Sequence, residues 1–218
     1  MTTTQTTGLT TFHYTGLAIL AVACAIASIN PLEFSSYLLH QLGTLLMVIG
    51  LLTVTLKGWV SRVGFAGTIV FLLLHVSAAH YLYSYVPYND WLISWFGWDM
   101  NATFGWTRNM YDRLVHLMYG VLLYPLIADL LRRAFPQSRP SVIALLVIQF
   151  VMASSVFYEF IEWWIALGMS PEEAENYNGQ QGDIWDAHAD MALATLGSII
   201  SALLLWLKSI TTPKAHEE

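Results

Sequence analysis

Long hydrophobic runs alternate with short polar stretches along almost the whole of this chain. A hydrocarbon core about 30 Å thick is crossed by roughly 20 mostly apolar helical residues, and six runs meet or approach that length. They cover residues 14–30, 36–56, 61–86, 109–131, 141–168 and 184–208. The pattern predicts an all-α polytopic membrane bundle of six transmembrane helices, with residues 1–218 forming a single integral membrane domain.

The stretches between and before these runs carry weaker local signals. The start, "MTTTQTTGLTTFHY", lacks the basic region of a signal peptide, so we expect residues 14–30 to be retained as the first helix. Residues 87–108 are rich in Trp, which is typical of a loop in the membrane–water interface, and a short amphipathic helix is expected at 89–97. The acidic "SPEEAEN" (170–176) is expected to be a surface loop with helix-capping residues.

Composition supports a membrane protein and excludes several other classes. With 56% hydrophobic and only 11% charged residues, the chain is unlike an ordinary soluble domain. The net charge of -6 and the lack of a Lys/Arg cluster argue against a nucleic-acid partner. The single Cys24 excludes an internal disulfide. The predicted partner is therefore the lipid bilayer, and nothing in the sequence specifies an oligomeric state.

The basic residues predict the orientation, because Lys and Arg in short loops remain on the cytoplasmic side. They follow the second, fourth and sixth helices: Lys57, Arg62, Arg132, Arg133, Arg139, Lys208 and Lys214. The other connections are mainly acidic and carry Glu33, Asp90, Asp99, Glu172, Glu173 and Glu175, with one Arg, Arg108. Both termini are then cytoplasmic (N-in/C-in), and the Trp-rich loop between helices 3 and 4 faces outward.

Ionisable side chains gather near the outward ends of the last four helices. At about 1.5 Å rise per residue, one group lies roughly 5 to 15 Å below the outer surface: His75, His80, Asp112, His116, Glu159, Glu162, Asp186 and Asp190. Three pairs are three or four residues apart and share a helix face, namely Asp112 with His116, Glu159 with Glu162, and Asp186 with Asp190. His75 and His80 diverge by about 140° around their helix, and depth favours His80.

Such a concentration of carboxylates would repel strongly unless the groups are protonated or balanced by cations, and ionisable groups in the membrane are costly. Arg113 is the only basic side chain close by in the sequence. A divalent transition metal, zinc in the first place and iron or manganese otherwise, suits imidazole and carboxylate donors. We therefore predict that His80, His116, Glu162 and Asp190 bind the metal. Glu159 or Asp186 is predicted to be the general base or a bridging ligand.

Three further residues are predicted to support the site or to add ligands: His75, Asp112 and Asp183. Asp183 is more simply explained as a helix cap, because acidic side chains favour helix N-termini. A single His or Asp in a membrane helix is usually a hydrogen-bonding contact between helices, so a purely structural polar network remains an alternative. The aromatic residues Tyr81, Tyr83, Tyr85, Trp163 and Trp164 fit an interfacial belt.

Four segments carry a resemblance to a known family. They read "HVSAAHYLYSYVP" (75–87), "NMYDRLVHLMYG" (109–120), "YEFIEWW" (158–164) and "GQQGDIWDAHADM" (179–191). As a set they resemble the YjdF-like family of bacterial inner-membrane proteins, over about residues 75–200. The resemblance implies a multi-pass protein of the bacterial inner membrane but no settled activity. One departure is Ala128 and Asp129, where the family tends to have Arg-Glu.

Two classes of function remain in competition. The first is a metal-dependent membrane enzyme that acts near the periplasmic face on a lipid or lipid-linked substrate, most simply by hydrolysis. A di-iron site would oxidise a lipid chain instead, but the Glu-x-x-His spacing of such bundles is absent from the sequence. The second is a proton- or ion-coupled transporter or sensor, which would need polar groups through to the inner face or broken helices. A subunit with only a structural polar cluster is a third alternative.

Overall fold

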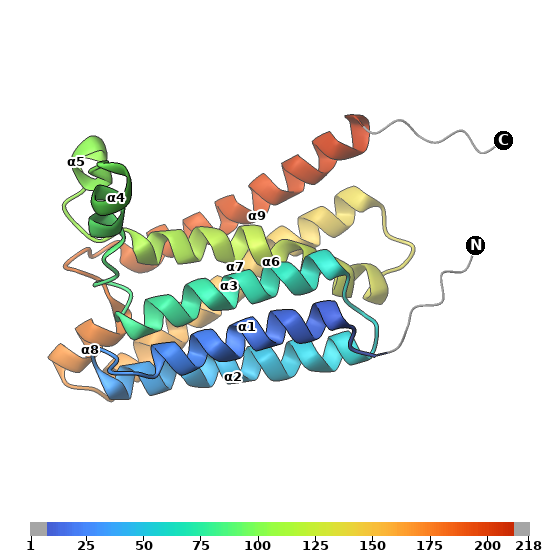
Figure 1. Ribbon diagram of the computed structural model, residues 1–218. Helices are drawn as coiled ribbons and strands as arrows, with labels where there is room; N and C mark the ends of the chain where they lie inside the picture. Colours follow the sequence, from blue (N-terminus) through green and yellow to red (C-terminus); the bar gives the residue numbers. More distant parts are fainter. Residues whose placement is uncertain (1–7, 212–218) are drawn as a thin grey trace.

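The computed structural model describes residues 8–211 of the chain. These residues form six long helices and three short ones, joined by connecting segments. The long helices run side by side (Figure 1): α1 (Thr11–Ala27), α2 (Phe34–Leu56), α3 (Arg62–His80), α6 (Tyr111–Ala134), α7 (Pro140–Leu167) and α9 (Asp186–Thr211). The short helices lie at one end of this bundle: α4 (Tyr88–Phe96), α5 (Met100–Phe104) and α8 (Pro171–Asn178). Within the described residues there is no strand, which confirms the all-α prediction.

Five of the helices, α2, α3, α6, α7 and α9, are long and apolar enough to cross a membrane. The first helix, α1, is also apolar but has only 17 residues. At 1.5 Å per residue it is about 25 Å long, somewhat shorter than a hydrocarbon core of about 30 Å. The fold therefore contains five candidate spans and one shorter apolar helix.

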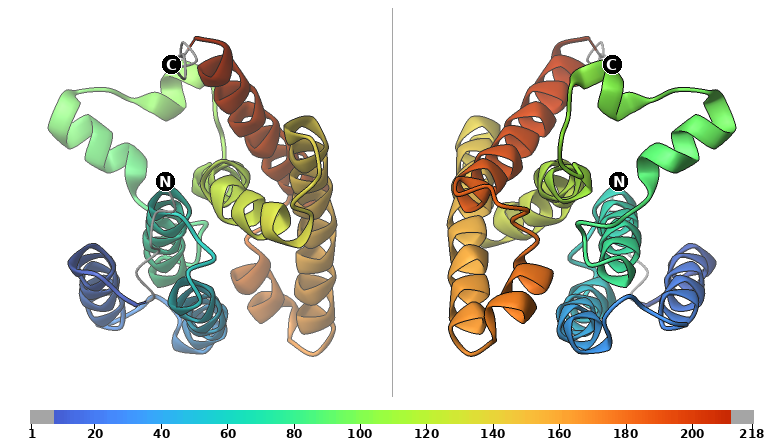
Figure 2. Two further views of the ribbon diagram at one scale, coloured as in Figure 1. Left: turned by 90° about the vertical axis from the view of Figure 1, so that its right-hand side faces the viewer. Right: turned by 90° about the vertical axis from the view of Figure 1, so that its left-hand side faces the viewer.

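Helix α6 occupies the centre of the bundle. It packs most extensively against α9 and α3, while α1 and α2 pack on the other side of α3 and α7 packs on α9 and α6. Seen along the helices, α1, α2 and α3 form one group and α6, α7 and α9 another (Figure 2). The contact between α3 and α6 joins the two groups.

Small residues allow α6 and α9 to cross with their backbones in contact. A Cβ atom added to Gly120 of α6 would collide with the carbonyl oxygen of Ala194, and one added to Gly197 of α9 would collide with that of Leu117. Ala194 and Ser198 between them are fully buried. Close approach through small residues is a common way for membrane helices to associate. Here it brings the N-terminal half of α6 against that of α9.

The third predicted helix ends earlier than expected. Residues 61–86 were predicted as one helix, but α3 ends at His80 because Leu82 and Tyr83 adopt left-handed backbone conformations, with φ of 51° and 56°. The Tyr83 N–H donates to the carbonyl of Ala78 at 2.7 Å, which satisfies the helix end. The Tyr83 side chain turns inward and is only 7% exposed, so its assignment to the interfacial belt is wrong. Tyr85 and Trp163 are exposed, as expected of that belt.

The loops contain more helix than the sequence indicated. Helix α4 confirms the short helix expected at 89–97, and α5 follows it. The segment 170–176 was expected to be a loop but begins helix α8, because Pro171 suits the first helical turn and Ser170 with Glu173 forms a capping box. Helix α8 lies against α7 and also touches α2.

Charges separate between the two ends of the bundle. The α2–α3 and α6–α7 connections, with the C-terminal end of α9, lie at the end opposite α4, α5 and α8 (Figure 1). The basic residues of the sequence prediction fall on these segments, except Lys214, which lies outside the described residues. Asp129 also lies there, and its carboxylate accepts from the Ser61 N–H at 2.8 Å. It therefore helps to cap α3, away from the other intramembrane carboxylates.

Candidate metal centre

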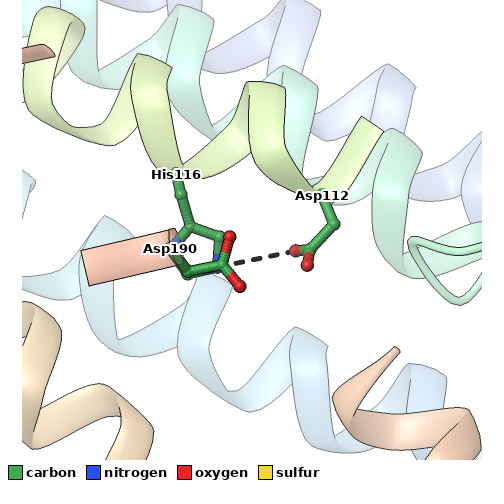
Figure 3. Close-up of side chains that lie close together, drawn as sticks. All are labelled: Asp112, His116 and Asp190. Atoms are coloured by element: carbon green, nitrogen blue, oxygen red, sulfur yellow. Dashed lines mark ion pairs between the residues drawn. The ribbon is translucent and has the colours of Figure 1, made fainter. Parts of the chain in front are cut away.

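Three side chains from α6 and α9 converge near the end of the bundle at which α4, α5 and α8 lie (Figure 1). Asp112 and His116 are one turn apart on α6, and Asp190 faces them from the second turn of α9 (Figure 3). The His116 Nε2 atom lies 3.5 Å from Asp112 Oδ1 and 4.0 Å from Asp190 Oδ1. All three potential ligand atoms lie within 4.8 Å of one another.

These separations suit a common metal ion. Ligand bonds of about 2.0–2.2 Å in tetrahedral geometry place neighbouring donor atoms roughly 3.3–3.6 Å apart. The His116–Asp112 distance of 3.5 Å already matches, and the 4.0 Å distance to Asp190 requires only a small shift. Asp190 is 3% exposed and its Oδ1 atom has no hydrogen-bond partner. This buried oxygen has the Arg113 guanidinium as its close ion-pair partner, at 2.8 Å, and also faces His116.

Arg113 connects α6 to the start of α9. Its Nη2 atom donates to Asp186 Oδ1 at 2.7 Å and to Asp183 Oδ2 at 3.0 Å. Its Nη1 atom donates to the backbone carbonyl of Asp186 and lies 2.8 Å from Asp190 Oδ1. The last contact lacks hydrogen-bond geometry. Arg113 therefore lowers the electrostatic cost of the buried Asp190 carboxylate through a close ion pair.

A second guanidinium group was missed by the sequence analysis. Arg108, in the segment before α6, donates from Nη1 to Asp186 Oδ1 at 2.7 Å and to Asp183 Oδ2 at 3.3 Å. Asp186 is thus held between Arg108 and Arg113, so its carboxylate is already paired. The three aspartates near the start of α9 indicated that more than one positively charged group is needed. Arg108 could not be recognised as the second one, because it lies 78 residues from Asp186 in the sequence.

Asp183 combines the predicted capping role with an ion pair. Its Oδ1 atom accepts from the Trp185 N–H at 2.9 Å, just before α9 begins. That hydrogen bond, together with the Arg113 and Arg108 guanidinium groups, lowers the pKa of the Asp183 carboxyl below its usual value. Asp183 lies at the outer edge of the cluster and is not part of the group around His116.

Negative charge still exceeds positive charge after these pairings. Six carboxyl groups lie on or beside the outward ends of α6, α7 and α9: Asp112, Glu159, Glu162, Asp183, Asp186 and Asp190. Arg108 and Arg113 are the two guanidinium groups that pair with carboxylates there. The Oε1 atom of Glu159 is buried and has no hydrogen-bond partner. Unbalanced buried carboxylates repel one another, so some of these carboxyl groups must be protonated or balanced by a further cation.

A cavity of about 240 Å³ lies next to this group. It is enclosed by α2, α3, α6, α7, α8 and the segment after α3, and its lining comprises His40, Gly43, Met47, Phe71, His75, Tyr83, Asp112, Val115, His116, Tyr119, Ser154, Ser155, Tyr158, Glu162, Tyr177 and Asn178. Glu162 of the predicted ligand set therefore faces the same space as Asp112 and His116. Glu159, one turn earlier on α7, does not line it.

The expected preference for His80 over His75 is reversed. The His80 Nδ1–H donates to the Ala27 carbonyl at 2.8 Å and so ties the end of α3 to the end of α1, away from the cavity. His75 lines the cavity instead. Its Nε2–H donates to the His40 carbonyl at 3.1 Å, which leaves Nδ1 to accept from the Tyr83 hydroxyl. Both ring nitrogens of His75 are engaged, so it shapes the site without being free to ligate.

His40 was not considered in the sequence analysis, because α2 carries no recognisable motif. Its Nδ1–H donates to the Ser36 carbonyl at 2.7 Å, so the lone pair of Nε2 remains available. The imidazole lies between the rings of Tyr83 and Tyr177, with centroid distances of 5.0 Å and 4.7 Å. Burial raises the pKa of Tyr177 to about 12, so that phenol stays protonated. The one sequence feature that indicated a place for His40 in the site was its depth, six residues into α2.

Comparison with known proteins places this chain in a family. Residues 12–209 match a family described as "Predicted membrane protein (DUF2238)". The chain belongs to the DUF2238 family. Its members are described as membrane proteins, in agreement with the apolar helices of the structure. The match runs from α1 to α9 and includes every residue of the candidate metal centre and the cavity.

A similar protein is the inner membrane protein YjdF of Escherichia coli (strain K12), with 32% identity over 140 residues. The aligned region covers 63% of this chain and 63% of that protein, a little under two thirds of the relative's length. This bears out the resemblance seen in the sequence motifs. No solved structure matches this DUF2238 protein.

Proposed function

We propose that this protein is a metal-dependent enzyme of the bacterial inner membrane. Asp112, His116 and Asp190 would hold one divalent transition metal, with zinc favoured over iron and manganese by the mixed nitrogen and oxygen donors. The supporting observation is the convergence of these three groups from two helices within 4.8 Å, beside a cavity. Three protein ligands leave a coordination position for water or substrate, which is the pattern of catalytic zinc sites.

The geometry changes the roles assigned from the sequence. Asp112 becomes a ligand rather than a supporting residue, and His80 leaves the ligand set because it bonds to α1. Asp186 becomes a positioning residue that holds Arg113 against Asp190, since its own carboxylate is already paired. Glu162 lines the cavity and takes the place of general base or fourth ligand.

The proposed reaction is hydrolysis of a lipid or lipid-linked substrate. A bound metal would lower the pKa of coordinated water and polarise the carbonyl of the substrate. Glu162, facing the cavity, would accept the proton of that water. Burial of the site among membrane helices excludes bulk water, so that an apolar substrate and a single reacting water can meet.

A proton- or ion-coupled transporter or sensor is the second candidate. One observation favours it: the ion pairs from Asp190 through Arg113 and Asp186 reach Asp183, whose side chain is 35% exposed. A polar path thus leads from the cavity to one surface. Towards the other end of the bundle the described helices offer Asp129, which is occupied in capping α3. A path that reaches one face only fits an enzyme better than a conduit.

The proposed topology is a single membrane domain with α1, α2, α3, α6, α7 and α9 as six spans and both termini cytoplasmic. In a Cys24→Ser background, Gln137→Cys in the α6–α7 connection should react with a membrane-impermeant maleimide only after cell disruption. Glu172→Cys at α8 should react in intact spheroplasts. Both positions are exposed, so the reagent can reach them. Reversal of the two patterns would move the metal centre to the cytoplasmic side and contradict the proposal.

Metal content separates a ligand from an ion-pair partner. Protein purified in detergent without added metal should contain about one transition-metal ion per chain, measured by inductively coupled plasma mass spectrometry. Asp190→Asn should lower the metal affinity by about tenfold or more, since even the loss of an outer hydrogen-bonding partner costs 10- to 100-fold.

Asp186→Asn is the matched control for this experiment. It removes a buried carboxylate one turn away on the same helix, with the same Arg113 partner, but outside the ligand group. It should retain more metal than Asp190→Asn does, because it removes no ligand atom. Equal metal loss in the two variants would assign the effect to the ion pairs, and a metal-free wild-type protein would contradict the metalloenzyme.

A further inference from the structure

The cavity has one side where no helix packing closes it. Helices α2 and α7 both contribute to its lining, yet no extended interface joins them in residues 8–211. Helix α8 bridges them only at the outward end, where it touches both (Figure 2). Gly43 of α2 lines the cavity, is exposed, and would meet nothing within 4 Å if it carried a Cβ atom. The gap between α2 and α7 therefore opens sideways, at the level of the membrane.

The lining changes in character along the helices. Near the outward end it presents His40, Asp112 and Glu162. Deeper in the bundle it presents Met47 and Phe71, the former about 10 Å from His40 at 1.5 Å per residue. An amphiphile that lay in the outer leaflet with its chain towards the bilayer centre would have the same order of polar and apolar groups.

The charges of the lining restrict the headgroup. The lining carries the carboxyl groups of Asp112 and Glu162 and several phenols. Among the described residues that form it, there is neither Lys nor Arg. Phosphate groups are usually held by Arg or Lys, and Arg113 is already engaged by aspartates. Hydroxyl or ammonium groups, which donate hydrogen bonds to carboxylates, suit this lining better.

The size of the cavity restricts the rest of the molecule. The cavity volume of about 240 Å³ is larger than a cavity of about 150 Å³ that holds one benzene molecule. That space takes a small headgroup with the first carbons of one chain, while the remainder of the chain stays in the gap between α2 and α7. A phosphate headgroup suits the lining less well, because no Lys or Arg among the described lining residues is there to hold it.

We propose that the substrate is a single-chain lipid with a carboxylic ester or amide bond and a hydroxyl or ammonium headgroup, and that it enters sideways between α2 and α7. The substrate class rests on the proposed hydrolytic function, whereas binding and sideways access rest on the cavity alone. The ester or amide carbonyl would lie beside Asp112 and His116, with the chain directed past Gly43 and Met47.

Photochemical labelling tests this proposal on the whole protein in phospholipid vesicles. The probe is an N-acyl ethanolamine with a diazirine in the middle of its chain, and the comparison probe is lysophosphatidic acid with the same labelled chain. The ethanolamine probe should label α2 and α7 peptides that line the cavity, and an excess of unlabelled N-acyl ethanolamine should compete. The phosphate-bearing probe should label these peptides much less.

Two glycine variants of α2 distinguish the cavity from the outer surface. Gly43→Trp should fill the opening and lower the specific labelling by about tenfold, a loss of about 1.4 kcal/mol in binding. Gly50→Trp is the matched control, because Gly50 lies two turns further along α2, is exposed and equally free of neighbours, but does not line the cavity. Its specific labelling should be clearly higher than that of Gly43→Trp, because the entrance to the cavity stays open.

Equal labelling of the two variants, labels confined to the outer faces of the helices, or equal labelling by the phosphate-bearing probe would overturn the proposal. Metal content measured on the same preparations separates the two hypotheses. Specific labelling of a metal-free wild-type protein would retain sideways lipid binding and reject the metalloenzyme. Metal-loaded protein without specific labelling would reject the lipid and leave the metal site standing.

Discussion

Arg113→Met should destabilise the protein by about 3–5 kcal/mol, because removing one partner of a buried ion pair leaves the other charge uncompensated. Arg113 is 8% exposed, and its partners Asp186 and Asp190 are 5% and 3% exposed. The measurement is thermal unfolding in detergent, followed by Trp fluorescence and by recovery of monodisperse protein on size exclusion.

Two further variants test the reason for this loss. Arg108→Met should cost less, because Asp186 keeps its 2.7 Å contact with Arg113. The double variant Arg113→Met with Asp190→Met should recover part of the lost stability, because Asp190, which pairs with Arg113, is removed together with its partner, whereas Asp186 still pairs with Arg108. An Arg113→Met protein as stable as the wild type would show that the ion pairs of α9 do not hold the outward end of the bundle together.

Gly120→Leu should disrupt the fold at the crossing of α6 and α9. A side chain at this position meets the backbone carbonyl of Ala194 and the N–H of Ser198, which cannot move aside as a flexible side chain can. Overpacking of a core typically costs 1–3 kcal/mol, and a clash with backbone should reach or exceed about 3 kcal/mol. The expected result is a lower unfolding temperature together with loss of bound metal, because Asp190 moves away from Asp112 and His116.

A glycine on a free face provides the control. Gly50 of α2 has nothing within 4 Å of a Cβ position, so Gly50→Leu meets no obstacle there. It should be neutral or stabilising by up to about 1 kcal/mol, since glycine is a poor residue for a helix interior. If Gly120→Leu and Gly50→Leu unfold at the same temperature and keep equal metal, the close crossing does not position the metal centre.

The helices were largely predictable because their signal is local. Each hydrophobic run is long enough to cross a bilayer, and the predicted ranges for the second, fourth, fifth and sixth helices agree with α2, α6, α7 and α9 to within a few residues. The depth of the ionisable groups follows from the same count along each helix. It was therefore possible to expect Asp112, His116 and Asp190 at one level from their positions in the sequence.

The directions in which side chains point were not available from such counts. His80 had the better depth, but the left-handed turn at Leu82 and Tyr83 returns a tyrosine to the bundle, where its hydroxyl holds His75. That turn is possible because the bundle has space for the Tyr83 side chain, which is buried there. A prediction from periodicity continued the helix through it and selected the wrong histidine.

By itself the sequence determined a membrane protein of this family, with its acidic and imidazole groups near one end of the helices, because hydrophobicity and spacing along a helix are local properties. Tertiary structure alone decided which charges meet. Arg108 reaches Asp186 across 78 residues, and Asp190 reaches His116 because glycines let α6 and α9 touch. The rotation and register of two helices are set by contacts between residues far apart in the chain. Those contacts bring polar residues that share one depth close enough together to form a candidate metal centre.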